Sequence, residues 1–492
     1  MDSLRRIIKI LVAPLILVVA SGIFVGHHVA AHVQISPIDE YVYIDYFEKS
    51  ASQLGVAHGE KTGDFARNYL ACVGVAPAGP WAPEKCDLGD YSEDSRFPYM
   101  GINSADIYTP IYFVTSRIIA APIQTLLGVD LVTAGRLTGA VWLAASAILI
   151  FASLRRLGQK WLFSTAVPFF LIASLPAWWS TTYISTDAVA MFFGALLGYL
   201  LIRYLQTRRH GWIIMLVSGL AVLAKFQNLM IVALVTLVLL GDFFYSKYLQ
   251  RAQRAGRILE TVPSAGNDNL TAFGSVVALP ASRARNGNSV AVDEAPRHGA
   301  GTTNTAQVQP PRAGRRQLFI GFGIPLVALF SQALWMIIRP YPEGAEDPDQ
   351  GTATPLGITQ LIREAFKFFG SLTEGATGAE PFGASGIIVS LSLGWILIAA
   401  ILGSTTLSGF PLLKQISLAF LVTTFIGGPA LALATYIAEG YYFVLPSRYG
   451  LSLFPIMLVV MAAFFGRFRY WRAVLIALAA LCFIVSFAFS FH

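Results

Sequence analysis

The strongest constraint on the fold is a series of long apolar segments spaced along almost the whole chain. The first covers residues 10–31 and follows Arg5, Arg6 and Lys9. A run of this length can cross the ~30 Å hydrocarbon core of a bilayer as one helix. With 55% hydrophobic and 13% charged residues, the chain is also too apolar for a soluble single domain. The sequence therefore predicts an all-α polytopic membrane protein.

Ten further segments have the composition of spanning helices, which makes about eleven in all. They are residues 131–154, 161–181, 186–205, 211–224, 228–246, 317–338, 384–403, 415–437, 448–466 and 472–490. Segment 211–224 is short, and we expect it to border a cavity. Because Lys and Arg recur in alternate connections, the positive-inside rule predicts a cytoplasmic N-terminus and an external C-terminus. We expect this arrangement in the inner or plasma membrane.

Residues 108–127 are apolar enough to span but contain Pro110, Arg117, Pro122 and Gln124. If this segment crossed the membrane, the basic connection at Arg155 and every later basic loop would lie outside. An amphipathic helix in the plane of the membrane instead leaves all the basic loops on one side. We therefore expect in-plane juxtamembrane helices in the first outward loop, residues 32–130.

The loops divide the chain into three parts. The outward loop 32–130, which belongs to an N-terminal module of residues 1–246, has thirteen Asp/Glu against six Lys/Arg, as expected of an exported loop. Residues 247–316 have ten Lys/Arg against four Asp/Glu and few aromatic residues, which predicts a disordered cytoplasmic loop. This segment carries most of the net charge of +7, so the positive-inside rule explains the charge without a nucleic-acid partner. Residues 317–492 form a C-terminal module with a second outward loop, 339–383.

Two of the three cysteines, Cys72 and Cys86, lie in the first outward loop. In an oxidising compartment they would form a disulfide, and the alternative is a pair of free thiols. Cys482 lies in an apolar run and is expected to pack as a small hydrophobic residue.

An adjacent acidic pair, Asp39 and Glu40, follows the first spanning segment directly. A carboxylate close to hydrocarbon is costly unless it is paired or used, so its presence there favours a functional site. The structural alternative is a helix N-terminus, because Pro37 and Asp39 before an aromatic run also resemble a cap.

Other polar residues lie at the outward ends of later spans and are expected to converge with the acidic pair. They are Asp187, Lys225, Gln227, Asn228 and Arg448. Each has an ordinary structural explanation: Asp187 can cap a helix, and Lys225 and Arg448 can extend their charges to the membrane interface. Their common placement on the outward side favours a shared site.

These residue types suit glycosyl transfer from a sugar carried on a lipid phosphate. A carboxylate can accept the proton of an acceptor hydroxyl as general base. Arginine can bind the departing phosphate through a bidentate fork, and lysine can neutralise it as a point charge.

Several short motifs occur in an order that resembles the GT-C superfamily of membrane glycosyltransferases, which includes protein O-mannosyltransferases and aminoarabinose transferases. The motifs are Ser-Pro-Ile-Asp-Glu (36–40), Tyr-Thr-Pro-Ile-Tyr-Phe (108–113), Ala-Gly-Arg-Leu (134–137), Ser-Thr-Asp-Ala (185–188), Gly-Leu-Ala-Val-Leu-Ala-Lys (219–225) and Ser-Arg-Tyr-Gly-Leu-Ser-Leu-Phe-Pro (447–455). The resemblance covers most of the chain. It implies a polyprenyl-phosphate-sugar donor and an acceptor hydroxyl on a glycan, lipid or protein, with membrane lipids around the enzyme.

The resemblance also implies roles for individual residues. Asp39 would be the base, with Glu40 as its partner, and Asp187 would line the pocket. Lys225 and Arg448 would hold the lipid phosphate, next to Gln227 and Asn228. Relatives often have His-Pro-Pro where this chain has Tyr108-Thr109-Pro110, so Tyr108 is the candidate substrate contact at a position where the family histidine is missing. Dependence on a divalent metal varies in the superfamily, and the sequence leaves it undetermined.

Two other classes of protein fit parts of this pattern. A transporter or flippase of a lipid-linked saccharide would share a lipid-phosphate groove and basic residues. However, the chain has no clear internal repeat and few charges inside its spans. A catalytically silent scaffold is the third alternative, and the intact acidic pair argues against it.

Overall fold

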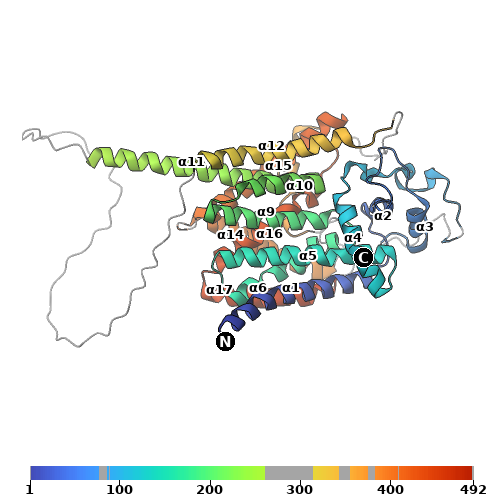
Figure 1. Cartoon of the computed structure of the whole chain (residues 1–492), viewed down its shortest axis with the longest axis horizontal. Helices are drawn as coiled ribbons and strands as arrows, with labels where there is room; N and C mark the ends of the chain where they lie inside the picture. Colours follow the sequence, from blue (N-terminus) through green and yellow to red (C-terminus); the bar gives the residue numbers. More distant parts are fainter. Residues whose placement is uncertain are drawn as a thin grey trace, which may run out of the picture.

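The computed structural model describes residues 2–76, 86–87, 89–260, 314–342, 355–374, 383–407, 409 and 411–489. Within these ranges the regular structure is helical, and extended pairing is limited to two isolated bridges, Ile35 with Val75 and Lys61 with Ile102. Long helices lie side by side as a bundle, while shorter helices gather at one of its ends (Figure 1). The all-helical prediction is confirmed for the described part of the chain.

Nine helical segments in the described ranges are long and apolar enough to cross a membrane. They lie in α1 (Asp2–Ala31), α5 (Leu131–Arg156), α9 (Asp187–Thr207), α11 (Leu229–Glu260), α12 (Arg315–Ile338), α14 (Gly383–Thr406), α15 (Pro411–Glu439), α16 (Phe454–Phe465) together with the preceding 3-10 turn η7 (Ser447–Leu453), and α17 (Arg469–Ser486). The chain is therefore a multi-pass membrane protein.

Two of the expected spans have a less regular form. Segment 161–181 is broken into α6 (Trp161–Ala166), α7 (Pro168–Ile172) and α8 (Leu175–Thr182), with a bend of 65° before α8. Pro168 and Pro176 lack a backbone N–H and sit in the first turns of α7 and α8, where a helix tolerates them. Segment 211–224 forms the short helix α10 (Gly211–Ala224). The described residues thus provide nine spans, or ten if the bent pair counts as one.

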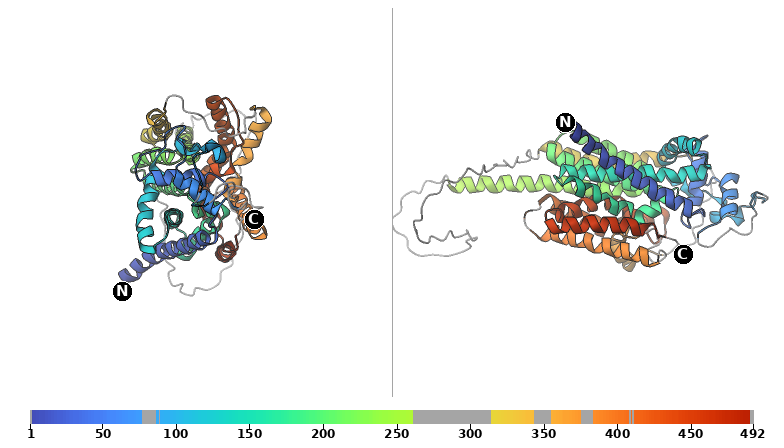
Figure 2. Two further views of the ribbon diagram at one scale, coloured as in Figure 1. Left: turned by 90° about the vertical axis from the view of Figure 1, so that its right-hand side faces the viewer. Right: turned by 90° about the horizontal axis from the view of Figure 1, so that it is seen from below.

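The described residues of the predicted outward loop 32–130 cap one end of the bundle (Figure 1). They form α2 (Glu40–Lys49), α3 (Asp64–Val73), α4 (Ile111–Leu127) and the short turns η1 (Asp94–Arg96), η2 (Pro98–Gly101) and η3 (Ser104–Ile107). Helix α4 runs crosswise over the end of the bundle in Figure 1 and in the left view of Figure 2.

This cap is fixed both internally and to the bundle. Cys72 and Cys86 form a disulfide, so the alternative of two free thiols does not apply. The Asp106 carboxylate accepts a hydrogen bond of 3.2 Å from Arg339, at the end of α12. The Thr109 hydroxyl donates to the Leu223 carbonyl at 2.7 Å, which connects the start of α4 to the end of α10. The two modules are therefore joined through the cap as well as through the bundle.

The expected boundaries of the central segment need correction. Helix α11 continues to Glu260, so the predicted disorder from 247 is wrong for its first part, and α12 already begins at Arg315. The rest of that segment, residues 261–313, lies outside the described residues. The second outward loop, 339–383, contains α13 (Ile358–Lys367) and the turn η5 (Gly370–Leu372), with Phe368 and Leu372 buried.

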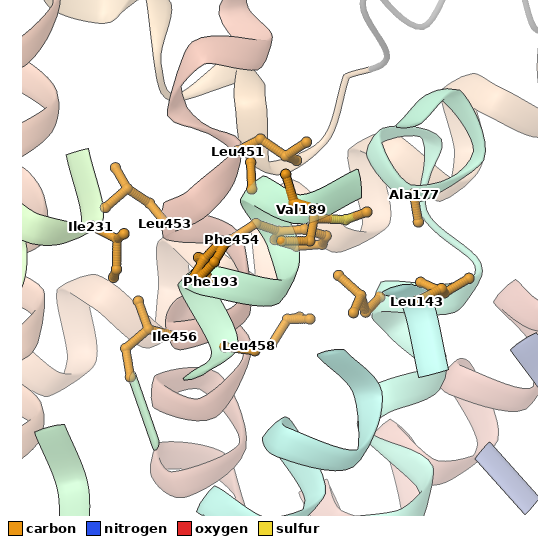
Figure 3. Close-up of a cluster of buried hydrophobic side chains, with 14 of the residues drawn as sticks. Leu143, Ala177, Val189, Phe193, Ile231, Leu451, Leu453, Phe454, Ile456 and Leu458 are labelled. Carbon is orange, nitrogen blue, oxygen red and sulfur yellow. The ribbon is translucent and has the colours of Figure 1, made fainter. Parts of the chain in front are cut away.

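The core of the bundle depends on close helix contacts. A side chain at Gly139 would overlap the backbone of Thr181, and one at Gly194 would overlap the backbone of Ser452. Small residues let helices in a membrane approach closely, so Gly194 sets the distance between α9 and η7. Figure 3 shows the buried cluster around this contact, in which Val189 and Phe193 pack near Leu451 and Phe454.

Candidate functional site

The acidic pair lies where the chain turns from α1 into α2. Asp39 is the residue before α2 and has a left-handed backbone, with φ 58° and ψ −15°. A non-glycine residue in this region costs of the order of 1–3 kcal/mol, and such strain concentrates at functional sites. The Asp39 side chain makes no cap hydrogen bond, and 25% of its surface is exposed. The simple capping interpretation therefore does not describe Asp39.

Arg448 reaches Asp39 from the other module. It lies in η7, and its Nη2 donates to Asp39 Oδ2 at 2.5 Å. Its Nε lies 3.7 Å from Asp187 Oδ2. One guanidinium thus faces two carboxylates, one before α2 and one at the start of α9.

Asp187 is in turn paired with a lysine. The Lys225 ammonium donates to Asp187 and, at 3.2 Å, to the Thr186 hydroxyl. The Ser185 hydroxyl donates to Asp187 Oδ2 at 3.3 Å. Both charged side chains are almost fully buried, so neither extends to the interface as a snorkelling side chain would. Asp39, Asp187, Lys225 and Arg448 form one connected group, here called the charge cluster.

Glu40 is adjacent in sequence but is engaged elsewhere. Its two carboxylate oxygens accept hydrogen bonds of 2.8 and 2.9 Å from Arg136. They also accept the backbone N–H groups of Ser36 and Ile184, at 2.8 and 2.9 Å. Arg136 further donates to backbone carbonyls of the segment that follows α1, and both side chains are at most 2% exposed. Glu40 thus fixes the turn that presents Asp39.

Tyrosine side chains border Asp39. The Tyr43 hydroxyl lies 3.5 Å from Asp39 Oδ2 and 3.3 Å from the Tyr108 hydroxyl. Burial raises the pKa of Tyr43 and that of Tyr108 well above the usual value, so both groups remain protonated donors. Tyr108 therefore lies near the charge cluster, as its predicted role requires.

Gln227 and Asn228 lie in the turn η4 (Phe226–Asn228), directly after Lys225. The Asn228 amide donates to the Ala221 carbonyl at 2.8 Å and closes the end of α10. Gln227 is 8% exposed and neighbours Tyr449, the residue after Arg448. Gln227 is therefore placed near the charge cluster, while Asn228 completes the helix end.

A cleft with about 200 Å³ of empty space opens beside the charge cluster. Asp187 and Arg448 line it together with Pro176, Trp179, Ser180, Ser371, Glu374 and Leu451. The α8 residues Trp179 and Ser180 have only a weak sequence signal, an aromatic and hydroxyl-rich run before Asp187. Glu374 has none, since an acidic residue in a loop has no distinctive pattern.

The cleft combines chemical groups with different roles. It offers a fixed cation, two carboxylates, two hydroxyls and an indole ring, and Arg448 also contacts Asp39. In the described residues, the only close group of three metal-ligand types is Cys72, Cys86 and Asp87, and the disulfide removes both thiolates. The carboxylates Asp39 and Asp187 are engaged by cations. The arrangement can bind an anion and position a base.

No model of a known protein family matches the chain, and a search of curated proteins finds no match. The class of protein is therefore defined by the fold alone, as a multi-pass helical membrane protein with a buried charge cluster at one end of the bundle.

Proposed function

We propose that this chain is an integral membrane glycosyltransferase of GT-C type. It moves a sugar from a polyprenyl-phosphate donor to a hydroxyl of a glycan, lipid or protein. The observation that carries the proposal is the contact of Arg448 with Asp39, because it places a phosphate-binding group next to a partly exposed carboxylate. The neighbouring cleft, which Asp187 and Arg448 line, opens beside this contact.

In the proposed reaction, Asp39 accepts the proton of the acceptor hydroxyl. The acceptor oxygen then forms a bond to the anomeric carbon while the bond from that carbon to the phosphate oxygen breaks. The released polyprenyl phosphate carries the additional negative charge, which Arg448 and Lys225 balance. Both cations come from the protein, so this scheme contains no step that requires a bound metal.

The free protein holds Asp39 and Arg448 together, and donor binding changes this pairing. A phosphate competes for the guanidinium, because arginine binds phosphate and carboxylate through the same fork. As the phosphate takes Arg448, Asp39 becomes available to the acceptor. Asp187 keeps Lys225 in place, and Glu40 keeps the turn in place through Arg136.

We further propose eleven spans, with α10 and the bent pair both crossing. Helix α10 begins beside Tyr204, near the end of α9, and ends at Lys225, which contacts Asp187 at the start of α9. It therefore covers most of the length of its neighbour despite its short sequence.

The site faces the periplasm or exterior in this proposal. Arg155 and Arg156 end α5, whereas the opposite end of the same helix lies at the acidic cap. Arg208 follows α9, again at the end remote from Asp187. By the positive-inside rule these arginines are cytoplasmic, and the Cys72–Cys86 disulfide suits an oxidising compartment for the cap.

The proposal is tested with membranes that contain the protein and matched membranes that lack it. Each is given a panel of radiolabelled polyprenyl-phosphate sugars, with endogenous lipid and glycan fractions as acceptors. We expect protein-dependent transfer of label from one donor. If no donor is used while labelled lipid-linked saccharide changes leaflet faster, the protein is a transporter or flippase and the proposal is wrong.

A further inference from the structure

A second cleft lies at the opposite end of the helices that carry the charge cluster. It has about 190 Å³ of empty space and is lined by Arg203, Tyr204, Arg209 and His210, with Leu200 and Ile213 as apolar walls. Arg203 is sixteen residues after Asp187 along α9, which corresponds to about 24 Å at the rise of an α-helix. The two clefts are therefore separate sites.

The turn between α9 and α10 gives this second cleft a defined shape. Arg208 and His210 both have left-handed backbones, with φ of 55° and 58°. A side chain at Gly211 would overlap Ile320 of α12 and crowd Tyr204 of α9. Helices α9, α10 and α12 thus pack closely against one another beside this turn.

The cleft has positive charge that the described residues do not balance. Asp242 pairs with Arg208 at 2.7 Å, and the side-chain amide oxygen of Gln317 accepts from the same guanidinium at 2.9 Å. Arg203 and Arg209, by contrast, form no ion pair with any residue in the described ranges. A charged side chain of this kind in a cleft favours an anionic ligand.

The surroundings of this cleft are typical of the level of lipid headgroups. It lies where α9 ends and α10 begins, and the neighbouring Trp212 is 56% exposed. Tryptophan is enriched at the boundary between hydrocarbon and water. Basic clefts between helices at this level bind anionic headgroups.

We propose that the cleft binds the phosphate of an anionic phospholipid. The two guanidinium groups bind the phosphate oxygens, and the His210 ring adds a hydrogen-bond donor. Leu200 and Ile213 contact the first carbons of the lipid. This binding site does not depend on the proposed glycosyl transfer, since it uses none of the residues of the charge cluster.

The test uses the purified full-length protein in a neutral detergent and native mass spectrometry with added phosphatidylglycerol or phosphatidylcholine. We expect Arg203→Gln/Arg209→Gln to weaken binding of the first phosphatidylglycerol by about ten- to thirtyfold, because each arginine near a lipid headgroup is worth ~1 kcal/mol. Binding of phosphatidylcholine should not change. The control Arg469→Gln/Arg472→Gln removes the same charge at the start of α17, outside the cleft, and should leave the first site intact.

Two results of this comparison would contradict the proposal. One is unchanged phosphatidylglycerol binding in the cleft variant, and the other is equal weakening in both double variants, which would mean non-specific attraction. The single variant Arg209→Gln, at an exposed position, gives the same comparison if the double variant does not fold. Displacement of the lipid by millimolar inorganic phosphate would identify a free phosphate as the ligand and overturn the lipid assignment. Sugar transfer is measured separately, so failure of either proposal is distinguishable.

Discussion

The guanidinium of Arg448 and the carboxylate of Asp39 are in direct contact, although 409 positions separate them in the chain. Asp39 follows the first long helix, α1, and Arg448 lies in η7, which leads into α16, the last helix but one. The contact therefore forms only when both modules are folded together. The site is therefore a property of the whole bundle. The proposed base is held by the same group that the proposed donor would bind.

Replacement of Arg448 by lysine keeps the charge but removes the fork that reaches Asp39 and Asp187. We predict a loss of transfer of about 10²–10³-fold, the range seen when a preorganised donor to a developing anion is removed. The measurement is the initial transfer rate at equal amounts of folded protein. Arg467→Lys, at the far end of α16, is the control and should behave like the wild type.

Glu40 and Arg136 are predicted to act on stability. Loss of one partner of this buried pair leaves the other charge uncompensated, so Glu40→Gln should destabilise the protein by about 3–5 kcal/mol. Thermal unfolding in detergent is measured for Glu40→Gln, for a variant of Arg136 and for the double variant. The coupling energy between Glu40 and Arg136 that these measurements give should be large. If Glu40→Gln kept the wild-type stability but lost transfer, Glu40 would be a catalytic residue.

Gly194 is predicted to be intolerant of a side chain. Its α-carbon faces the backbone of Ser452, so Gly194→Ala should force α9 and η7 apart and displace Arg448. We expect a destabilisation of about 1–3 kcal/mol and a lower transfer rate. Gly26→Ala is the matched control, because nothing lies within 4 Å of a methyl group there. Equal effects of the two substitutions would show that the close contact does not matter.

The disulfide is predicted to stabilise the cap. It closes a loop with a sequence separation of 14, for which the loss of unfolded-state freedom is worth about 3 kcal/mol. Reductant should lower the unfolding temperature of the wild type but not that of Cys72→Ser/Cys86→Ser. Cys482→Ser, which removes the buried free thiol, should still respond to reductant. A wild type insensitive to reductant would count against this role.

Hydrophobic runs were sufficient to predict the long helices, because a segment in lipid must form the hydrogen bonds of its backbone N–H and C=O groups within itself. They did not predict the bend before α8, where Ser174 caps the new helix and Pro176 lies in its first turn. The end of α11 was also placed too early. Apolarity stops near residue 246, whereas helical hydrogen bonding continues through the polar residues to Glu260.

For the site, the sequence placed Asp39, Asp187, Lys225 and Arg448 on one side of the membrane, and the structure brings them into contact. The sequence did not distinguish the roles of Asp39 and Glu40. Although the two residues are adjacent, Asp39 contacts Arg448 and Glu40 contacts Arg136. In the sequence, Arg136 stands out only as part of the motif Ala-Gly-Arg-Leu (134–137). Its hydrogen bonds to Glu40 and to three backbone carbonyls form only in the folded structure. Glu374 enters the cleft through tertiary packing alone.

The most direct test of the central claim is the sugar-transfer rate of Asp39→Asn beside that of the wild type, in purified protein at equal folded concentration and with the donor found active. Asparagine keeps the size of the side chain but cannot accept the proton. We predict no measurable transfer by Asp39→Asn, with an unfolding temperature close to that of the wild type. A folded Asp39→Asn protein that transfers sugar at the wild-type rate would contradict this prediction.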